Sequence, residues 1–414
     1  MSDVEQLFAD VAARHRRCFW LDGGGAREWS GRRSLLGWLD DDGVSLSYDA
    51  AAGVVTRHRG GRSVTVGEDP FAVLAAELAA GDPRAAWFGY FGYAARPDLP
   101  ARPDPAMPDA VWMRADHVRV FDHPLAGPAT PLRTAPAAVA VPASYAAGFA
   151  AVQEHLHAGD TYEVNLTYRQ HHAGPAGPDG PARVYRRLRT LNPAPYAGFL
   201  QHDVPGARGW LLSSSPERYA VVGADRVLQA KPIKGTLPRD PDAAVDAAHA
   251  AELARDPRFR AENLMIVDLL RHDLAQVCEV GSVEVPDLMV VESYPGVHQL
   301  VSTVRGRLRD GVGTVAALRA LFPAGSMTGA PKRRTMQVID AVEPDPRGVY
   351  SGAFGWVSAD GRADLGVVIR SLATAGDGDY LLGTGGGITV HSELATEWTE
   401  STWKAARVAS ALTD

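Results

Sequence analysis

The stretch VEVPDLMVVESYPGVHQLVSTVRGRL, residues 283–308, holds two strand-like runs rich in valine and leucine, 283–291 and 297–308. Turn-forming residues separate the two runs, and no helix-length segment stands between them. Strand-like runs elsewhere in the chain also follow one another in groups and do not alternate strictly with helical windows. This grouping predicts an α+β fold with antiparallel sheets and argues against a doubly wound parallel sheet.

The same pattern extends from this stretch in both directions. Strands are expected at 162–169, 196–201, 209–212, 219–222, 349–357 and 366–372. Helices are expected at 145–157, 243–255, 261–278, 314–321, 332–341 and 393–412. The Pro- and Ala-rich segment 122–142 lacks periodicity, which predicts a linker. The chain therefore divides into an N-terminal region, 1–121, and a larger region, 143–414.

The composition excludes several classes of protein. The 414 residues carry a formal net charge of −7, which argues against a nucleic-acid partner, because such proteins need a clustered basic face. Two cysteines, Cys18 and Cys278, cannot form a disulfide scaffold and fit a reducing compartment. The N-terminus resembles no signal peptide, and no apolar run approaches the roughly 20 residues that span a bilayer. We therefore expect a cytoplasmic enzyme with no membrane partner.

The expected C-terminal helix carries a polar face. Glu393, Glu397, Glu400 and Lys404 recur at helical spacing, and Ser392 is a candidate N-cap. A solvated stripe is the simplest interpretation of such a face. However, two carboxylates one turn apart hold a hard divalent cation when another segment adds oxygen ligands.

Glu262, near the start of the expected helix 261–278, is the candidate for that further ligand. The run LMIVDLL in this helix is apolar nearly all round, which predicts a buried helix. Taken alone, Glu262 is interpreted as an acid that complements the helix dipole. Together with Glu397 and Glu400 it indicates a Mg²⁺ site, because Mg²⁺ takes a few carboxylates, water and often a substrate oxyanion.

The segment KPIKGTLPR, residues 231–239, is expected to be a loop constrained by proline and glycine. Such a loop holds Lys234 in a fixed place. A desolvated lysine has a lowered pKa and acts as a nucleophile, whereas the alternative is an exposed loop cation. Upstream, Glu217 in SSSPERY is a candidate general acid or base.

Two further segments indicate recognition of an anion. GTGGGI, residues 383–388, is expected to be a loop whose backbone approaches an anion closely, although it matches neither a P-loop nor a dinucleotide fingerprint. Arg370, at the end of LGVVIR, is a candidate bidentate clamp for a carboxylate, or else a surface residue. By themselves, these residues indicate Mg²⁺-assisted chemistry on a small molecule that carries a carboxylate.

The order of the motifs says more. YEVNLTYR, SSSPERY, PIKGT, ENLMIVDLLRHDL, HQLVSTV, FPAGSMTGAPKRRTMQVID, YSGAFGWV, ADLGVVIRSL and GGGITVHSELATEWTES follow one another between residues 162 and 401. Together they resemble the chorismate-utilising enzymes, and within that family the aminodeoxychorismate-forming branch. FWLDGGGAREWSGRRSLLG and AAWFGYFGY, near the N-terminus, resemble the family more weakly.

The resemblance implies one intertwined α+β unit, with two large antiparallel sheets packed as a β-sandwich core and helices on the outside. It implies chorismate as substrate and Mg²⁺ as cofactor. The roles that it implies are metal binding for Glu262, Glu397 and Glu400, recognition of the enolpyruvyl carboxylate for Tyr350, Arg370, Gly385, Gly386 and Gly387, proximity to the ring carboxylate for Gly235 and Thr236, and acid/base catalysis for Glu217.

Lys234 distinguishes the branches, because the anthranilate-forming enzymes carry alanine at this position of PIKGT. The resemblance implies that Lys234 attacks ring C2 as the C4 hydroxyl leaves, and that ammonia then enters at C4 and displaces the lysine. Neither Cys18 nor Cys278 stands in an amidotransferase motif. We therefore expect a separate glutamine amidotransferase subunit to supply the ammonia. The sequence leaves open whether the product serves folate or a secondary metabolite.

The chain departs from the family pattern at several positions. Glu163 replaces the usual Gln of YQVNL, and Phe259, His272 and His391 alter residues near the expected metal ligands. Two alternatives therefore remain beside the aminodeoxychorismate-forming activity. One is a sister enzyme that makes anthranilate, aminodeoxyisochorismate, isochorismate or salicylate. The other is a catalytically silent homologue that binds chorismate.

Overall fold

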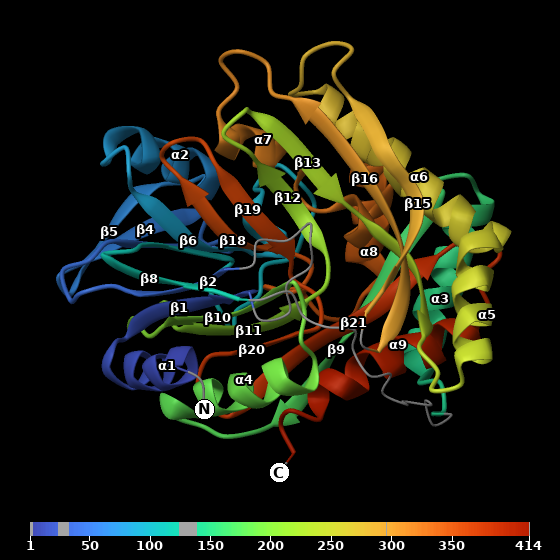
Figure 1. The fold of residues 1–414 in the computed structure, drawn as a ribbon, viewed down its shortest axis with the longest axis horizontal. Helices are drawn as coiled ribbons and strands as arrows, with labels where there is room; N and C mark the ends of the chain where they lie inside the picture. The colour runs from blue at the N-terminus through green and yellow to red at the C-terminus, as the bar shows by residue number, and fades with distance from the viewer. Residues whose placement is uncertain (1–2, 24–32, 124–138, 295, 414) are drawn as a thin grey trace.

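Two large antiparallel sheets form the centre of the computed structural model, which describes residues 3–23, 33–123, 139–294 and 296–413 (Figure 1). The nine-stranded sheet has the order β17 (Gly329–Ala330), β9 (Glu163–Ala173), β21 (Asp379–Ile388), β20 (Ser371–Thr374), β11 (Gly209–Ser215), β10 (Tyr196–His202), β1 (Arg17–Asp22), β2 (Arg33–Trp38) and β8 (His117–Asp122). The expected α+β class is thus confirmed.

The twelve-stranded sheet has the order β14 (Ile233–Pro238), β16 (Val297–Arg307), β13 (Val227–Lys231), β12 (Arg218–Val222), β19 (Ala363–Val367), β18 (Ala353–Ser358), β6 (Ala86–Phe91), β7 (Ala110–Arg114), β3 (Ser45–Asp49), β4 (Val54–Arg59) and β5 (Arg62–Gly67). β15 (Glu284–Ser293) also pairs with β16. Val291 lies opposite Leu300 in that antiparallel pair, as the two neighbouring strand-like runs predict. Strands from residues 17–122 extend both sheets.

The helices cover the outer faces of the sheets (Figure 1). They are α1 (Asp3–Arg14), α2 (Pro70–Ala80), α3 (Ala143–His157), α4 (Asp179–Leu191), α5 (Ala243–Arg255), α6 (Pro257–Ala275), α7 (Thr314–Leu321), α8 (Lys332–Val342) and α9 (Leu394–Ala409). Among the described residues, no helix is long and apolar enough to cross a membrane.

Alternation along the strands explains the layers. In β1, Cys18 and Trp20 pack with residues of α1, α4 and α9, whereas Phe19 between them packs on Phe88 of the opposite sheet. Successive side chains of a strand point to opposite faces, so a strand buried on both sides is apolar throughout. The nine-stranded sheet is therefore buried between a helical layer and the second sheet.

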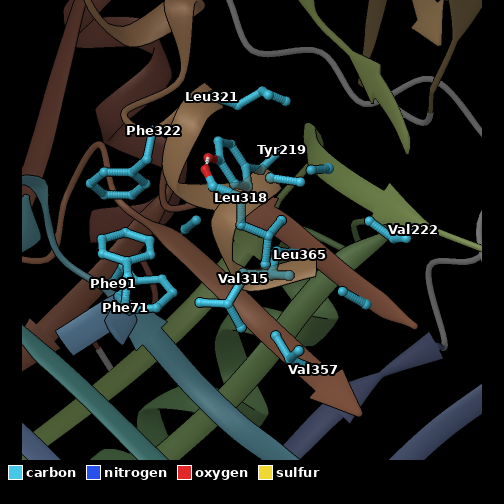
Figure 2. Packing of buried hydrophobic residues seen from close by; sticks show 14 of the residues in the cluster. Phe71, Phe91, Tyr219, Val222, Val315, Leu318, Leu321, Phe322, Val357 and Leu365 are labelled. Atoms are coloured by element: carbon cyan, nitrogen blue, oxygen red, sulfur yellow. Dashed lines mark hydrogen bonds between the residues drawn. The ribbon is translucent and has the colours of Figure 1, made fainter. Parts of the chain in front are cut away.

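The twelve-stranded sheet is covered on its other face by α2, α6 and α7. Figure 2 shows the packing there, where the ring of Phe71 stacks on that of Phe91 with centroids 3.8 Å apart. Tyr219 reaches α7 and donates a hydrogen bond from its hydroxyl to the carbonyl oxygen of Leu318 at 2.6 Å. These contacts fix α2 and α7 against the sheet. α6, which carries one of the predicted site residues, packs in the same core cluster.

Several expectations about local structure are wrong. KPIKGTLPR is not a loop, because its residues form the end of β13 and all of β14. GTGGGI is not a loop either, since it forms the end of β21 and pairs along β9. α6 is not buried all round: Leu264 is 53% exposed, and the buried residues gather on one side of the helix. Most of the expected linker 122–142, residues 124–138, lies outside the described residues.

Candidate active site

All twelve predicted site residues line one cavity of about 490 Å³. The cavity lies where β9, β14 and β21 meet α6 and the first turns of α9. The predicted residues in its lining are Glu217, Lys234, Gly235, Thr236, Glu262, Tyr350, Arg370, Gly385, Gly386, Gly387, Glu397 and Glu400. Segments more than 180 residues apart in the chain thus converge on one site.

Glu262 comes from α6, and Glu397 and Glu400 come from α9. The hydroxyl of Ser392 donates a hydrogen bond to Glu397 Oε1 at 2.8 Å, and Lys404 pairs with Glu400 at 2.7 Å. The expected N-cap is therefore wrong: the residue before α9 is Glu393, and Ser392 instead binds a carboxylate of the site. The acidic face of α9 borders the cavity and is not a solvated stripe.

Burial and mutual repulsion perturb these acids. Burial, followed by the charges of Glu163, Glu397 and Glu400, raises the pKa of Glu262 to about 8. Burial and the charge of Glu400 raise the pKa of Glu397 to about 7. Carboxylates that disfavour one another's charge in this way attract a cation.

The three carboxylates suit a hard cation chemically, but they do not surround a cation completely. Carboxylate oxygens are the ligands that Mg²⁺ prefers, and Mg²⁺ usually keeps several waters. Within the described residues, no three His, Cys, Asp or Glu side chains converge closely enough to enclose a metal ion. A cation held by Glu262, Glu397 and Glu400 would therefore depend on water or substrate oxygens to complete its coordination.

Lys234 lies on β14, in the wall of the cavity, and is 7% exposed. Its Nζ donates a hydrogen bond to Oε1 of Glu163, which is fully buried on β9. Burial lowers the pKa of Lys234, but the charges of Glu163 and Glu262 outweigh burial and raise it overall. The expected lowering of this pKa is therefore wrong, and the resting side chain is an ammonium ion.

Glu217 lies in the same wall and is also buried. It accepts a hydrogen bond from Ser326 Oγ at 2.6 Å. Burial raises the pKa of Glu217 to about 7, although this hydrogen bond and the charge of Lys234 oppose the shift. A carboxyl with such a pKa gives or takes a proton near neutral pH.

Arg370 follows β19 in a left-handed backbone conformation, with φ of 50°. Burial and the charge of Arg407 lower its pKa to about 10. Among the described residues no carboxylate forms an ion pair with it, so its guanidinium is available to an anionic ligand. Tyr350 is the residue predicted to share the carboxylate site with Arg370. Its ring lies under the guanidinium of Arg169, whose central carbon is 4.5 Å from the ring centroid.

The glycines of β21 allow close approach across the strand. A Cβ on Gly385 would lie 2.2 Å from the carbonyl oxygen of Leu166, and one on Gly386 would lie 3.1 Å from Glu397 Oε2. Gly235 has φ of 94° at a register shift between β14 and β16, which places Thr236 beside it along the cavity. The conformations and contacts at these positions leave no room for larger residues.

The cavity also holds residues that the sequence reasoning missed. Ser326 donates a hydrogen bond to Glu217. Gln299 lines the wall, and its buried amide oxygen has no hydrogen-bond partner in the described part of the chain. Both stand inside the quoted motifs FPAGSMTGAPK and HQLVSTV, but nothing in the residue types marks them. Of the departures, Phe259 and His391 line the cavity, whereas His272 is exposed on α6.

The model of the chorismate binding enzyme family matches residues 128–410. This chain belongs to that family. It is 52% identical over 254 residues to the aminodeoxychorismate synthase of Streptomyces pristinaespiralis, which covers 61% of this chain and 34% of that protein. It is 44% identical over 264 residues to aminodeoxychorismate synthase component 1 of Escherichia coli (strain K12), which covers 64% and 56%. The chain thus spans between a third and just over half of these relatives.

A longer match joins the chain to a different named activity. Anthranilate synthase component 1 of Streptomyces coelicolor is 37% identical over 375 residues, covering 78% of this chain and 72% of that protein. Among solved structures, anthranilate synthase component I of Streptococcus pneumoniae matches with a TM-score of 0.74 at 25% identity, over 93% of each chain. The menaquinone-specific isochorismate synthase of E. coli matches with a TM-score of 0.70 at 18% identity, over 98% of this chain and 91% of that one, which shows the fold alone.

Proposed function

We propose that this chain aminates chorismate to 4-amino-4-deoxychorismate through a covalent intermediate on Lys234. The observation that carries the proposal is the position of Lys234, a buried amine in the wall of a cavity. The same cavity holds Glu217 and Arg370, and Arg370 has no ion pair with any carboxylate that the structure describes. Relatives that are 44% and 52% identical and are named aminodeoxychorismate synthase support the choice of reaction.

In this proposal, two groups of cavity residues receive the two carboxylates of the substrate. Arg370 and Tyr350, with the backbone of β21 at Gly385–Gly387, receive the enolpyruvyl carboxylate. Gly235 and Thr236 border the ring carboxylate. Glu262, Glu397 and Glu400 would hold Mg²⁺ beside that carboxylate, where the ion would neutralise negative charge and assist departure of the hydroxyl.

Lys234 and Glu217 carry out the substitution. Lys234, as the free amine, attacks ring C2 while the double bond shifts and the C4–O bond breaks. Glu217 gives its proton to the departing hydroxyl, which leaves as water, and a pKa of about 7 keeps that proton available at neutral pH. Ammonia then adds at C4, the double bond shifts back, and the C2–N bond to Lys234 breaks.

Ammonia comes from a separate glutamine amidotransferase subunit in this proposal. Both cysteines are buried outside the cavity, and burial raises the pKa of the Cys278 thiol to about 11. Neither is therefore suited to be a thiolate nucleophile. The E. coli relative is named component 1, which is consistent with a second component. Purified chain is expected to use ammonium salts but not glutamine.

The deciding experiment incubates the chain with chorismate, Mg²⁺ and an ammonium salt and identifies the product by mass and chromatographic retention. Aminodeoxychorismate supports the proposal. Anthranilate rejects it and favours the second candidate, anthranilate formation, which is the named activity of the S. coelicolor relative matched over 375 residues. Salicylate, isochorismate or no turnover rejects both.

Lys234→Ala tests the covalent step separately. We expect this variant to bind chorismate but to lose amination at C4, and amination at the normal rate would contradict the covalent role. Lys231→Ala is the matched control. Lys231 lies three residues away, pairs with Glu292 at 2.6 Å and is absent from the cavity lining, so its loss should leave the reaction unchanged in folded protein.

A further inference from the structure

The nucleophile of the proposed reaction is locked in an ion pair. Lys234 Nζ donates to Oε1 of Glu163, and both side chains are buried. A protonated amine has no lone pair with which to attack carbon. The proton must therefore leave Lys234 before the covalent bond forms.

The surroundings of the pair leave few acceptors for that proton. The titratable groups that act on Lys234 include Glu163 on β9, Glu217 just before β12, Glu262 on α6 and Glu397 on α9. Glu217 accepts a hydrogen bond from the hydroxyl of Ser326 and is the proton donor to the leaving group in the proposed reaction. Among the described carboxylates, Glu163 is the one that accepts a hydrogen bond from Nζ.

The second oxygen of Glu163 also matters. Oε2 is buried and has no hydrogen-bond partner among the described residues. Gly387 closes this part of the wall, because a Cβ there would lie 2.2 Å from Glu163 Oε1 and 2.8 Å from Lys234 Nζ.

We propose that Glu163 is a catalytic base that takes the proton from Lys234 Nζ as the lysine attacks chorismate and returns it when the lysine is released. This inference rests on the proposed covalent role of Lys234. It assigns Glu163, at the position where related enzymes usually carry Gln, a role in making the nucleophile.

The protons and electron pairs balance through the cycle. The proton of the ammonium moves to Glu163, and the freed lone pair of Nζ forms the bond to C2 while the hydroxyl leaves with the proton of Glu217. Ammonia then forms the C4–N bond, and the C2–N bond breaks with its electron pair returning to Nζ. Glu163 gives its proton back to Lys234, and Glu217 recovers one from the new C4 ammonium group. The net change replaces a hydroxyl by an amine and releases water.

Glu163→Gln tests the proposal because Gln keeps the shape and the hydrogen bond but cannot take a proton. The measurement is the rate of formation of the Lys234 adduct in a single turnover with chorismate and Mg²⁺, followed by the mass of the quenched protein from pH 6 to 9. We expect the variant to be about 100-fold slower than the wild type at pH 6. Its rate should rise with pH, because hydroxide then removes the proton. A variant rate within twofold of the wild type at pH 6 would overturn the proposal.

Two further measurements separate a chemical from a structural effect. The affinity for chorismate at equilibrium should be the same in the variant and the wild type, because Glu163 does not line the cavity. If Glu163→Gln fails to fold, Glu163→Asp carries the test. It keeps a carboxylate at a greater distance, so adduct formation should be slower than in the wild type without gaining the steep pH dependence, and a rate equal to the wild type contradicts the assignment. Absence of the adduct in the wild type itself would instead reject the covalent role of Lys234.

Discussion

Ser326 donates a hydrogen bond to Glu217 at 2.6 Å, and this contact is the largest of the interactions that oppose the rise in the carboxyl's pKa. Glu217 must hold a proton to protonate the leaving hydroxyl. In the wild type, kcat is therefore expected to fall as pH rises through about 7, where Glu217 loses that proton.

Ser326→Ala is expected to move this fall in kcat to higher pH. Without the donor the charged carboxylate is less stable, so the pKa of Glu217 rises and the acid form persists longer. Profiles of kcat from pH 5.5 to 9 check the shift. If kcat fell at the same pH as in the wild type, a group other than Glu217 would control the fall.

Gly387→Ala is expected to lower the rate of amination about 100-fold or more, because the added Cβ would displace Glu163 and Lys234. Gly313→Ala is the control, since a Cβ at Gly313 meets nothing within 4 Å and its φ of −76° suits alanine. Steady-state kinetics and melting temperatures of both variants make the comparison. Normal turnover in folded Gly387→Ala would mean that the pair tolerates displacement.

Glu262→Gln is expected to raise the Mg²⁺ concentration for half-maximal activity about tenfold or more, since removing one of a few carboxylates weakens binding of the cation. Asp268→Asn is the matched control on the same helix. Asp268 is exposed and pairs with Arg271 at the surface, at 3.2 Å. Mg²⁺ titrations of activity after treatment with a chelator provide the measurement, and equal Mg²⁺ dependence in the two variants would remove Glu262 from the metal site.

Two buried histidines in the N-terminal half predict acid lability. Burial lowers the pKa of His58 to about 4 and that of His202 to about 3. Both are held by hydrogen bonds, His58 with Ser47 Oγ at 2.8 Å and His202 with Ser45 Oγ at 2.9 Å. The folded state keeps both neutral, while the unfolded chain binds protons below its histidine pKa of about 6.5.

The contribution of these histidines to stability is therefore complete above about pH 6.5 and is lost as pH falls toward 4. Each histidine should lower the free energy of unfolding by about 1.4 kcal/mol per pH unit as pH falls through that window. Urea denaturation at pH 7.5, 6 and 5 measures this slope for the wild type and for His202→Gln. The variant should lose stability less steeply, and an unchanged slope would assign the acid lability elsewhere.

Local patterns predicted much of the secondary structure. The expected helices 243–255 and 314–321 coincide with α5 and α7, because periodic apolar residues and clear ends, such as the Asp242 cap, specify them locally. The same reasoning failed at the two glycine-containing segments, 231–239 and 383–388. Glycine indicates a turn when the sequence is considered alone, yet in β21 it permits Tyr350 to pack against the strand, since a Cβ on Gly383 would lie 2.2 Å from its ring.

By itself, the sequence determined the class of fold, the family and twelve of the residues that line the cavity, because the pattern of strands and the motifs are local and ordered along the chain. Only the tertiary structure decided what those residues do to one another. Ser392 binds Glu397, and Lys234 is held as an ammonium ion by Glu163 from a strand 71 residues away. Charge states and hydrogen bonds depend on burial and on distances between separate segments, and these exist only once the two sheets and α6 and α9 have packed together.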